Sequence, residues 1–172
     1  MIKALSIAAI VVGISATSYA KHQWNINAAS CVADAGTIRN SLYLGTGGTV
    51  KFASGKTGDI ILYCPVPNLS FTPALLQLDF LDDVPRKDSR NGVTAQLIKM
   101  SMLDGSIRPV ITVFSNNAQT PANQGKASIT GLSFNDSYDP TNFAYYIRID
   151  IMRSAVTTNE IAYAVALLDK PI

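Results

Sequence analysis

The stretch Phe143–Arg153 reads FAYYIRIDIMR and carries the clearest strand signal in the chain. One set of alternate positions is apolar or aromatic, namely Phe143, Tyr145, Ile147, Ile149 and Ile151. The positions between them are mixed, namely Tyr146, Arg148, Asp150 and Met152. Successive side chains of a strand point to opposite faces of the sheet, so this period of two predicts a strand with one buried and one more polar face.

Short runs of the same kind recur on both sides of this stretch, separated by Gly, Asn, Asp and Pro. Such punctuation is typical of strands joined by turns. We expect further strands at 38–44, 49–53, 59–66, 75–81, 93–102, 110–114, 126–134 and 161–168. About nine short strands without a convincing helix predict an all-β fold. The predicted architecture is a two-sheet antiparallel sandwich, jelly-roll-like, with an immunoglobulin-like sandwich as the alternative.

Two of these runs contain local irregularities, and the last run is ambiguous. The apolar phase of 93–102 switches at Leu97/Ile98, as one inserted residue would cause, so we expect a bulge there. Gly131 interrupts 126–134 and marks a second possible bulge. In the last run we expect one face to hold Ile161, Tyr163, Val165 and Leu167, opposite three alanines. A helix remains an open alternative for this last run, because short apolar runs are ambiguous.

The first twenty residues have the three-part layout of a cleavable secretory signal. Lys3 precedes an apolar run, and small residues flank Tyr19 up to Ala20. We expect a signal peptide at 1–20, an extended N-terminal lead-in at 21–30 and a single β-sandwich domain at 31–172. The protein would be exported, periplasmic or extracellular, after cleavage near Ala20. No second apolar stretch is long enough to span a membrane.

The net charge limits the classes of partner to expect, and the cysteine content indicates the redox environment. Fourteen basic and twelve acidic residues give a net charge of +2, and removal of Lys3 with the signal reduces it to +1. This balance gives no electrostatic reason to expect nucleic acid as a partner. The two cysteines, Cys31 and Cys64, would mature where disulfides persist. The simplest pairing joins them to each other and pins the lead-in against strand 59–66. On a loop-entropy model this closure stabilises the fold by roughly 3–4 kcal/mol.

The sequence contains few candidate catalytic residues. His22 is the single histidine, so nucleophilic triads and multi-histidine zinc sites lack their parts. We predict no cofactor and no metal site of that kind. Carboxylate-dependent hydrolysis needs only two acids at suitable separation, and the acids that cluster in sequence are Asp79, Asp82, Asp83 and Asp88.

The same acids, with a second group, are candidate calcium ligands, because calcium takes oxygens from Asp, Asn and backbone carbonyls. The candidates are Asp82, Asp83, Asp88, Asp136 and Asp139. Neither group matches the spacing of an EF-hand loop. Acids in turns also serve solvation and local hydrogen bonding, which is the competing interpretation.

Exposed aromatic side chains would suit a glycan-binding module, since sugar rings stack on Tyr and Trp faces. The possible ligand-binding residues are Trp24, Tyr63, Tyr138 and Tyr146. Tyr63 and Tyr146 lie on the face opposite the apolar one if their strands run as expected. Tyrosines that simply cover a second sheet are the alternative.

Two resemblances can be drawn from short motifs. The segment Leu62–Val66 (LYCPV), with a cysteine before it and YYIRI at 145–149 after it, resembles small exported bacterial proteins with a Cys…Tyr-Cys-Pro-Val pattern. That resemblance implies export and a β fold, and supplies no activity. A looser likeness is to chaperone–usher pilus subunits, exported sandwiches with one early disulfide that polymerise by donating a strand. The ending 168–172 (LDKPI) departs from their pattern, since Pro171 disfavours strand pairing there.

These observations favour an exported, non-enzymatic β-sandwich with a binding or structural role outside the cytoplasm, binding a glycan or a cell-surface component. A subunit of an extracellular, pilus-like assembly, which would self-associate, is the alternative hypothesis. A carboxylate-dependent hydrolase is the third.

Overall fold

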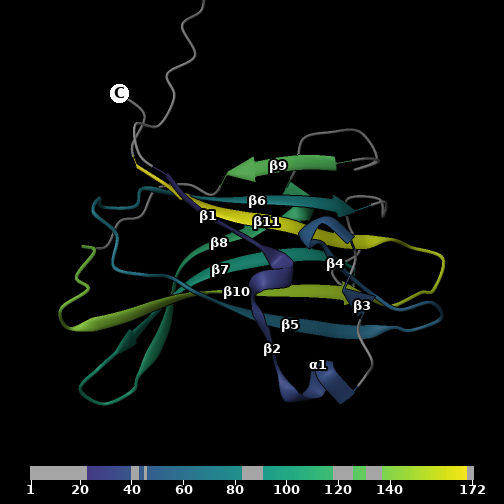
Figure 1. Cartoon of the computed structure of the whole chain (residues 1–172), viewed down its shortest axis with the longest axis horizontal. Coiled ribbons are helices and arrows are strands. Elements are labelled where there is room, and N and C mark those ends of the chain that lie inside the picture. Colours follow the sequence, from purple (N-terminus) through teal and green to yellow (C-terminus); the bar gives the residue numbers. More distant parts are fainter. Residues whose placement is uncertain are drawn as a thin grey trace, which may run out of the picture.

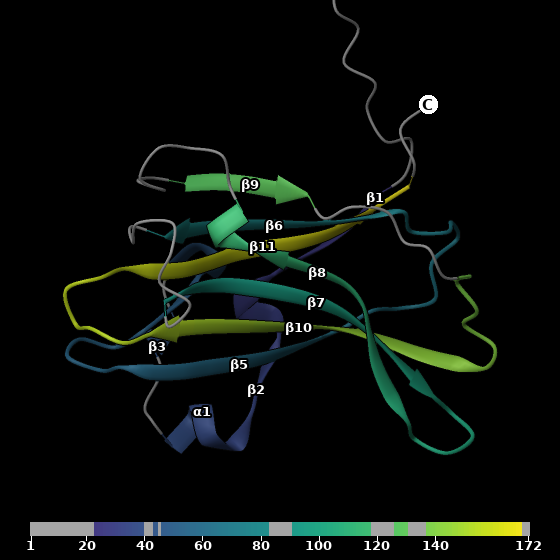
Figure 2. The same cartoon turned by 180° about the vertical axis from the view of Figure 1, so that it is seen from behind.

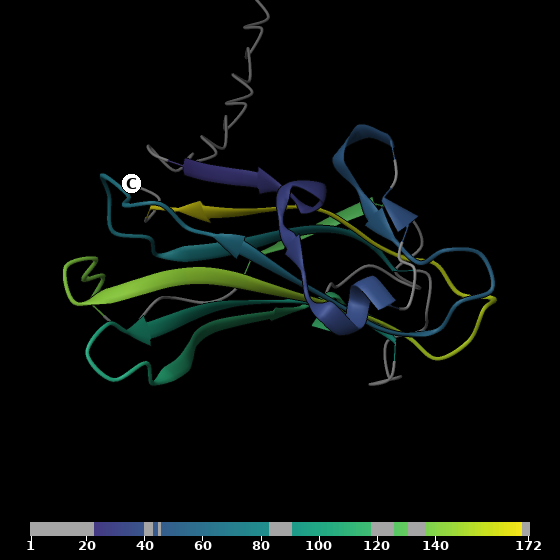
Figure 3. The ribbon, with the colours of Figure 1, turned by 60° about the horizontal axis from the view of Figure 1, so that its bottom comes forward.

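The computed structural model describes residues 23–39, 43–44, 46–82, 91–117, 126–130 and 137–169. The expected signal peptide, His22, Asp83, Asp88, Gly131 and Asp136 lie outside these residues. The described chain forms two antiparallel sheets stacked face to face, which confirms the predicted jelly-roll-like sandwich. Figure 3 shows the layers edge-on, with β1 and β11 in one and β10 in the other. None of the described helices is long and apolar enough to cross a membrane.

Sheet 1 has the strand order β3-β4-β11-β6-β9, and β1 pairs with β11 beside β4. Its strands are β1 (Gln23–Asn27), β3 (Tyr43–Leu44), β4 (Val50–Lys51), β6 (Leu75–Asp82), β9 (Lys126–Thr130) and β11 (Glu160–Leu168). Within 21–30, expected to form an extended lead-in, residues Gln23–Asn27 therefore supply a strand of the sandwich. Short 3₁₀ turns follow at η1 (Ala28–Ser30) and η2 (Thr46–Gly48).

Sheet 2 has the strand order β2-β5-β10-β7-β8. Its strands are β2 (Val32–Ala33), β5 (Gly58–Pro65), β7 (Gly92–Ser101), β8 (Ile107–Phe114) and β10 (Phe143–Arg153). A 3₁₀ turn, η3 (Ser115–Asn117), follows β8. Figure 2 shows the β7–β8 hairpin extending beyond the other strands. The expected strand 143–153 is confirmed with the same bounds, and it lies at the centre of this sheet.

The core lies between the two sheets and is built by the alternation of each strand. On β10 the positions 145, 147, 149 and 151 are buried while their neighbours are partly exposed. Leu76, Leu78 and Phe80 of β6 face them from sheet 1 with no exposed surface. A Leu or Phe side chain buried in this way stabilises the fold by roughly 1.5–3 kcal/mol relative to its exposed state.

The expected strand 38–44 is wrong in its first part, where a short helix ends. This helix, α1 (Ala35–Arg39), follows Asp34, whose carboxylate accepts a hydrogen bond from the Thr37 amide at 2.6 Å. That bond satisfies one of the free amides of a helix N-terminus. The Thr37 hydroxyl in turn accepts a 2.7 Å hydrogen bond from the Ile61 amide of β5. β2 pairs with β5 through backbone hydrogen bonds, and α1 extends this contact along β5 through the Thr37 side chain.

The expected bulge at Leu97/Ile98 is right in place but wrong in strand. The register of β7 with β8 shifts there, yet the extra residue is Val110 of β8, and β7 pairs with β10 without a break. The alternation of inward and outward positions along β7 therefore continues through Leu97/Ile98. The sequence pattern switches there because an outward position holds apolar Ile98 and the next inward position holds Lys99. Lys99 shares a face with buried Tyr145 and is 4% exposed, over the Phe143 ring at 3.9 Å.

The face assignment for the last strand is also corrected. β11 shifts register against β6 between Ala162 and Ala164, so Tyr163 is an inserted residue. Val165 and Leu167 face the core as expected, whereas Ile161 and Tyr163 are only partly buried and Ala162 takes the core position. A bulge of one residue exchanges the faces on its two sides.

The predicted disulfide is confirmed between Cys31 and Cys64, whose Cα atoms are 4.4 Å apart. Cys31 lies between η1 and β2, and Cys64 is a buried residue of β5. The bond therefore ties the N-terminal segment of sheet 1 to the edge of sheet 2.

Candidate functional site

The outward-facing side of sheet 2 carries the two tyrosines that the sequence singled out together. Cross-strand partners share a face, so the register gives the rows directly. One row runs Pro65–Tyr146–Ile98–Pro109, the next Val32–Tyr63–Arg148–Gln96–Thr112, and the third Ile61–Asp150–Thr94–Phe114. We call these three rows the open face. Several of its side chains are well exposed, namely Val32 (66%), Tyr63 (38%) and Phe114 (44%).

Tyr63 and Tyr146 form an aromatic pair on this face. Their ring centroids are 5.8 Å apart with an interplanar angle of 71°, an edge-to-face arrangement. Such a pair contributes about 0.5–1.5 kcal/mol beyond the area it buries. The two rings therefore hold each other in place while Tyr63 remains accessible.

Arg148 lies directly opposite Tyr63 in the register and pairs with Asp150 of its own strand. The distance from Nη2 of Arg148 to Oδ1 of Asp150 is 2.9 Å, and Nε donates to the same oxygen at 3.0 Å. Burial raises the pKa of the Asp150 carboxyl above its usual range, although Arg148 opposes that shift. Burial acts to lower the pKa of Arg148, but the hydrogen bond and charge of Asp150 outweigh it and the net pKa is raised.

Two further carboxylates act on this ion pair. The charges of Asp59 and Asp34 both raise the pKa of Asp150, and the charge of Arg148 helps to lower the pKa of Asp34. On the other side of Arg148, Gln96 Nε2 donates to Thr112 Oγ1 at 3.3 Å. The centre of the open face is thus a fixed set of hydrogen-bonding groups with more acidic than basic side chains.

The other two aromatic candidates, Trp24 and Tyr138, pack against the core. Trp24 pairs with Leu167 in the register of sheet 1 and packs partly buried against the core. Tyr138 lies with its ring 4.8 Å from that of Tyr145, and its hydroxyl accepts a 2.9 Å hydrogen bond from the Leu69 amide. The structure therefore does not bring these two residues to the open face.

The candidate carboxylates that the structure describes, Asp79, Asp82 and Asp139, do not gather into one centre. Asp79 accepts a hydrogen bond from Gln77 at 3.1 Å, and the alternation of β6 places Asp79 and Asp82 on different faces of the sheet. Asp82 is fully buried, and its Oδ2 accepts a 2.5 Å hydrogen bond from the Ser115 hydroxyl. Glu160 is its register partner and lies 3.8 Å from Nε of Arg153.

Asp139 is committed to its own turn. It accepts hydrogen bonds from the amides of Thr141 and Asn142 and from Asn142 Nδ2. The side-chain bond from Asn142 is the main cause that lowers the pKa of Asp139. Across the described ranges there is no group of three His, Cys, Asp or Glu residues that could hold a metal ion.

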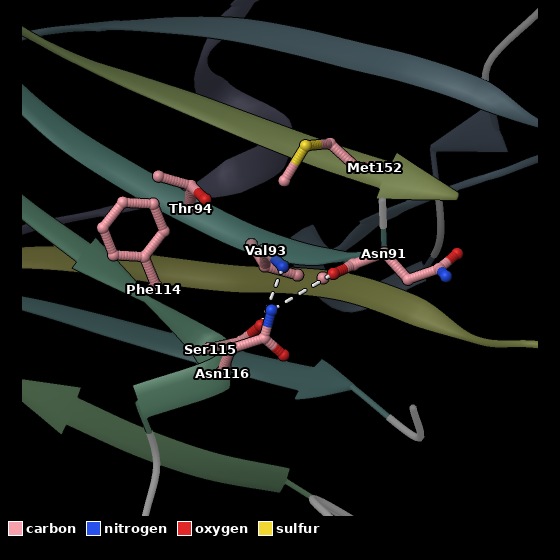
Figure 4. Close-up of a pocket in the computed structure, with 8 residues that line it drawn as sticks. Asn91, Val93, Thr94, Phe114, Ser115, Asn116 and Met152 are labelled. Atoms are coloured by element: carbon pink, nitrogen blue, oxygen red, sulfur yellow. Dashed lines mark hydrogen bonds between the residues drawn. The ribbon is translucent and has the colours of Figure 1, made fainter. Parts of the chain in front are cut away.

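Sequence reasoning found the two tyrosines but missed the polar groups between them. The signal was present, since Tyr146, Arg148 and Asp150 occupy alternate positions of one strand. Gln96 and Thr112 join this set through long-range pairing only. A pocket of about 150 Å³ at one end of the open face, lined by Thr94, Phe114 and Met152 among others, was also missed (Figure 4).

Comparison with known proteins gives similar folds without a family. No protein-family model and no curated protein matches the chain. It is similar to the CBM36-1 domain of a multidomain xylanase from the hindgut metagenome of Trinervitermes trinervoides, at 9% identity and a TM-score of 0.49, covering 88% of this chain and 100% of that one. It is also similar to the xylan-binding module CBM15, at 12% identity and a TM-score of 0.47, covering 88% and 99%.

A third similar structure is a β-1,3-glucan binding CBM6 from Bacillus halodurans, at 10% identity and a TM-score of 0.44, covering 88% of this chain and 97% of that one. At identities and scores this low, neither family membership nor activity follows from these likenesses.

Proposed function

We propose that the protein is a non-enzymatic binding module that holds a neutral glycan on the open face of sheet 2. The observation that carries this proposal is the Tyr63–Tyr146 pair beside the Arg148–Asp150 ion pair on one exposed surface. Sugar rings present apolar faces and a rim of hydroxyl groups. An aromatic surface next to fixed donors and acceptors complements both parts.

The charges of the face support a neutral ligand. Asp34 and Asp59 lie close enough to Asp150 to raise its pKa, and Arg148 is the basic group that acts on both Asp34 and Asp150, so an anionic glycan would meet net repulsion. Carboxylates accept hydrogen bonds from hydroxyl groups, and a guanidinium donates to ring and hydroxyl oxygens. Because each of these groups already has a partner, little reorganisation is needed when a ligand binds.

The binding test compares variants on the two outer faces of the sandwich. Affinity for a panel of neutral soluble polysaccharides would be measured by calorimetry for the wild type, Tyr63→Ala and Gln77→Ala. We expect a ligand whose affinity falls about tenfold or more in Tyr63→Ala, equivalent to about 1.4 kcal/mol. The Gln77→Ala control, on sheet 1, should retain it. Equal affinities for all three proteins, or no binding across the panel, would contradict the proposal.

Export is a separate part of this proposal. The layout of residues 1–20 and the Cys31–Cys64 disulfide support maturation outside the cytoplasm. N-terminal sequencing of the protein recovered from the periplasm or medium should begin at Lys21. Recovery only from the cytoplasm, with Met1 retained and free thiols, would contradict it.

A further inference from the structure

The middle row of the open face crosses every strand of sheet 2. It takes one residue from each of β2, β5, β10, β7 and β8, in the order Val32–Tyr63–Arg148–Gln96–Thr112. Figure 1 shows these five strands side by side in that order. Among the described strands, none pairs beyond β2 or beyond β8 in this sheet. Neither edge of the described sheet therefore closes the row.

The row has the length and the spacing of a short oligosaccharide. Neighbouring strands lie about 4.8 Å apart, so the four intervals from Val32 to Thr112 add up to roughly 19 Å. Successive rings of an extended β-1,4-linked sugar chain advance by nearly one strand spacing. Along a strand, outward residues recur only at every second position, about 6.7 Å apart. The sugar repeat therefore matches the spacing across the sheet better than the spacing along a strand.

The side chains of the middle row change from apolar to polar across the sheet. Val32 and Tyr63 are well exposed at one end. Arg148 follows, with 38% of its side chain exposed. Gln96 and Thr112 complete the row and are joined by a 3.3 Å hydrogen bond between their side chains. One end can therefore stack on a sugar ring while the rest exchanges hydrogen bonds with hydroxyl groups.

The two neighbouring rows are shorter and suit hydroxyl groups less well. The first row crosses four strands, and its only side-chain hydrogen-bonding group is the Tyr146 hydroxyl. The third row also crosses four strands, and its Thr94 is buried. The middle row is therefore the one that offers contacts on all five strands.

We propose that the middle row binds an extended, β-1,4-linked neutral chain that lies across the strands, an inference that rests on the glycan-binding function proposed above. With one sugar ring over each strand, a ring stacked on Tyr63 places the next rings over Arg148 and Gln96. The chain then continues towards Thr112 at the edge of the sheet. Chains that curve, such as β-1,3- and α-1,4-linked glucans, would leave the row after the first rings.

The linkage test compares neutral tetrasaccharides by calorimetry. Three have β-1,4 linkages, namely cellotetraose, mannotetraose and xylotetraose. Two curve, namely laminaritetraose with β-1,3 linkages and maltotetraose with α-1,4 linkages. We expect at least one β-1,4-linked tetramer to bind at least about tenfold more tightly than either curved one. The matching disaccharide covers only two strands, so it should bind at least about tenfold more weakly than the tetramer.

Two variants test the direction of the chain. Thr112 lies three strand spacings from Tyr63, roughly 14 Å. Thr112→Val should therefore weaken binding of the tetramer about threefold or more and leave the disaccharide unchanged. Met152 lies two rows from Arg148 along β10, where only a chain running along the strand would reach it, so Met152→Ala should change neither affinity. Gln77→Ala on sheet 1 is the control, and thermal unfolding would confirm that each variant is folded.

The outcomes separate this inference from the function on which it rests. A linkage preference below about tenfold, equal affinity for disaccharide and tetramer, or a larger loss in Met152→Ala than in Thr112→Val would overturn the extended-chain site while the glycan-binding function stands. Binding of polysaccharides without binding of any β-1,4-linked tetramer would do the same. Absence of binding to any glycan would overturn both.

Discussion

The two outward-facing surfaces of the sandwich share a construction but differ in chemistry. On sheet 1 the described outward residues include Ala164 and Ala166, half-buried leucines and a local Gln77–Asp79 hydrogen bond. On sheet 2 the corresponding positions hold an aromatic pair, an ion pair and a pocket. The inner faces of both sheets are mainly apolar, apart from a few buried charged residues such as Asp82, Lys99 and Glu160. Fold and function are therefore separable here, since the core makes the sandwich and one outer face carries the specific chemistry.

The largest expected effect comes from the covalent link that holds the edge of sheet 2. Replacing both Cys31 and Cys64 with Ser should lower the free energy of unfolding by about 3–4 kcal/mol, because the unfolded chain regains the freedom that the cross-link removed. Urea unfolding measures this change. Gln77→Ala, on the outer surface of sheet 1, should change stability by less than about 0.5 kcal/mol. A loss of similar size in both proteins would contradict the asymmetry.

A smaller loss is expected at the floor of the pocket. Gly92→Ala places a side chain at a φ of +128°, with its Cβ 2.8 Å from Ser115 Oγ and 3.2 Å from Asp82 Oδ2. We expect a destabilisation of about 1–3 kcal/mol, the usual range for strained backbone. Chemical denaturation measures it. Gly58→Ala is the matched control, because its φ is +120° but nothing lies within 4 Å of the added atom. Equal losses would show that the contacts with Ser115 and Asp82 add nothing.

The smallest effect is a pH dependence with opposite signs at two carboxyls. Burial raises the pKa of Asp150 above the usual 3.8, so the folded state holds this proton more tightly than the unfolded state. The stability that this group contributes is therefore present below 3.8 and is lost as the pH rises through the raised value. The stability of the wild type relative to Asp150→Asn should fall as the pH rises from below 3.8 through the raised pKa of Asp150.

Asp34 should behave in the opposite way. Its pKa is lowered, mainly by the side-chain hydrogen bond with Thr37. Its contribution is present above 3.8 and is lost as the pH falls through the lowered value. The stability of the wild type relative to Asp34→Asn should therefore rise with pH over the acidic range. Unfolding curves at several pH values give both slopes, and slopes of the same sign would contradict this assignment.

Sequence reasoning was reliable where alternation was strong and local. FAYYIRIDIMR predicted the bounds and both faces of β10, because the buried positions 145, 147, 149 and 151 hold large apolar or aromatic residues. It failed on β11, where alternating alanines fit either face and the inserted Tyr163 leaves no clear mark. It also missed α1, although Asp34 three residues before Thr37 is a helix N-cap signal.

The candidate site was predictable only in part for the same physical reason. Tyr63 and Tyr146 could be placed on an outer face by period alone. Their proximity depends on the pairing of β5 with β10, which the local sequence pattern does not predict. The pocket depends on still more distant partners, since Asn91, Phe114 and Met152 come from three separate segments. Contacts of this kind are set by tertiary register and not by local pattern.

The central claim is that sheet 2, and not sheet 1, carries the binding surface. The most direct measurement is a map of backbone amide chemical shifts by NMR as a neutral glycan that binds in the panel is added to the folded protein. We expect changes concentrated on Tyr63, Gln96, Arg148 and Asp150, with little change at Asn25 and Gln77. Changes concentrated on sheet 1, or saturable binding without any change on β5 and β10, would contradict it.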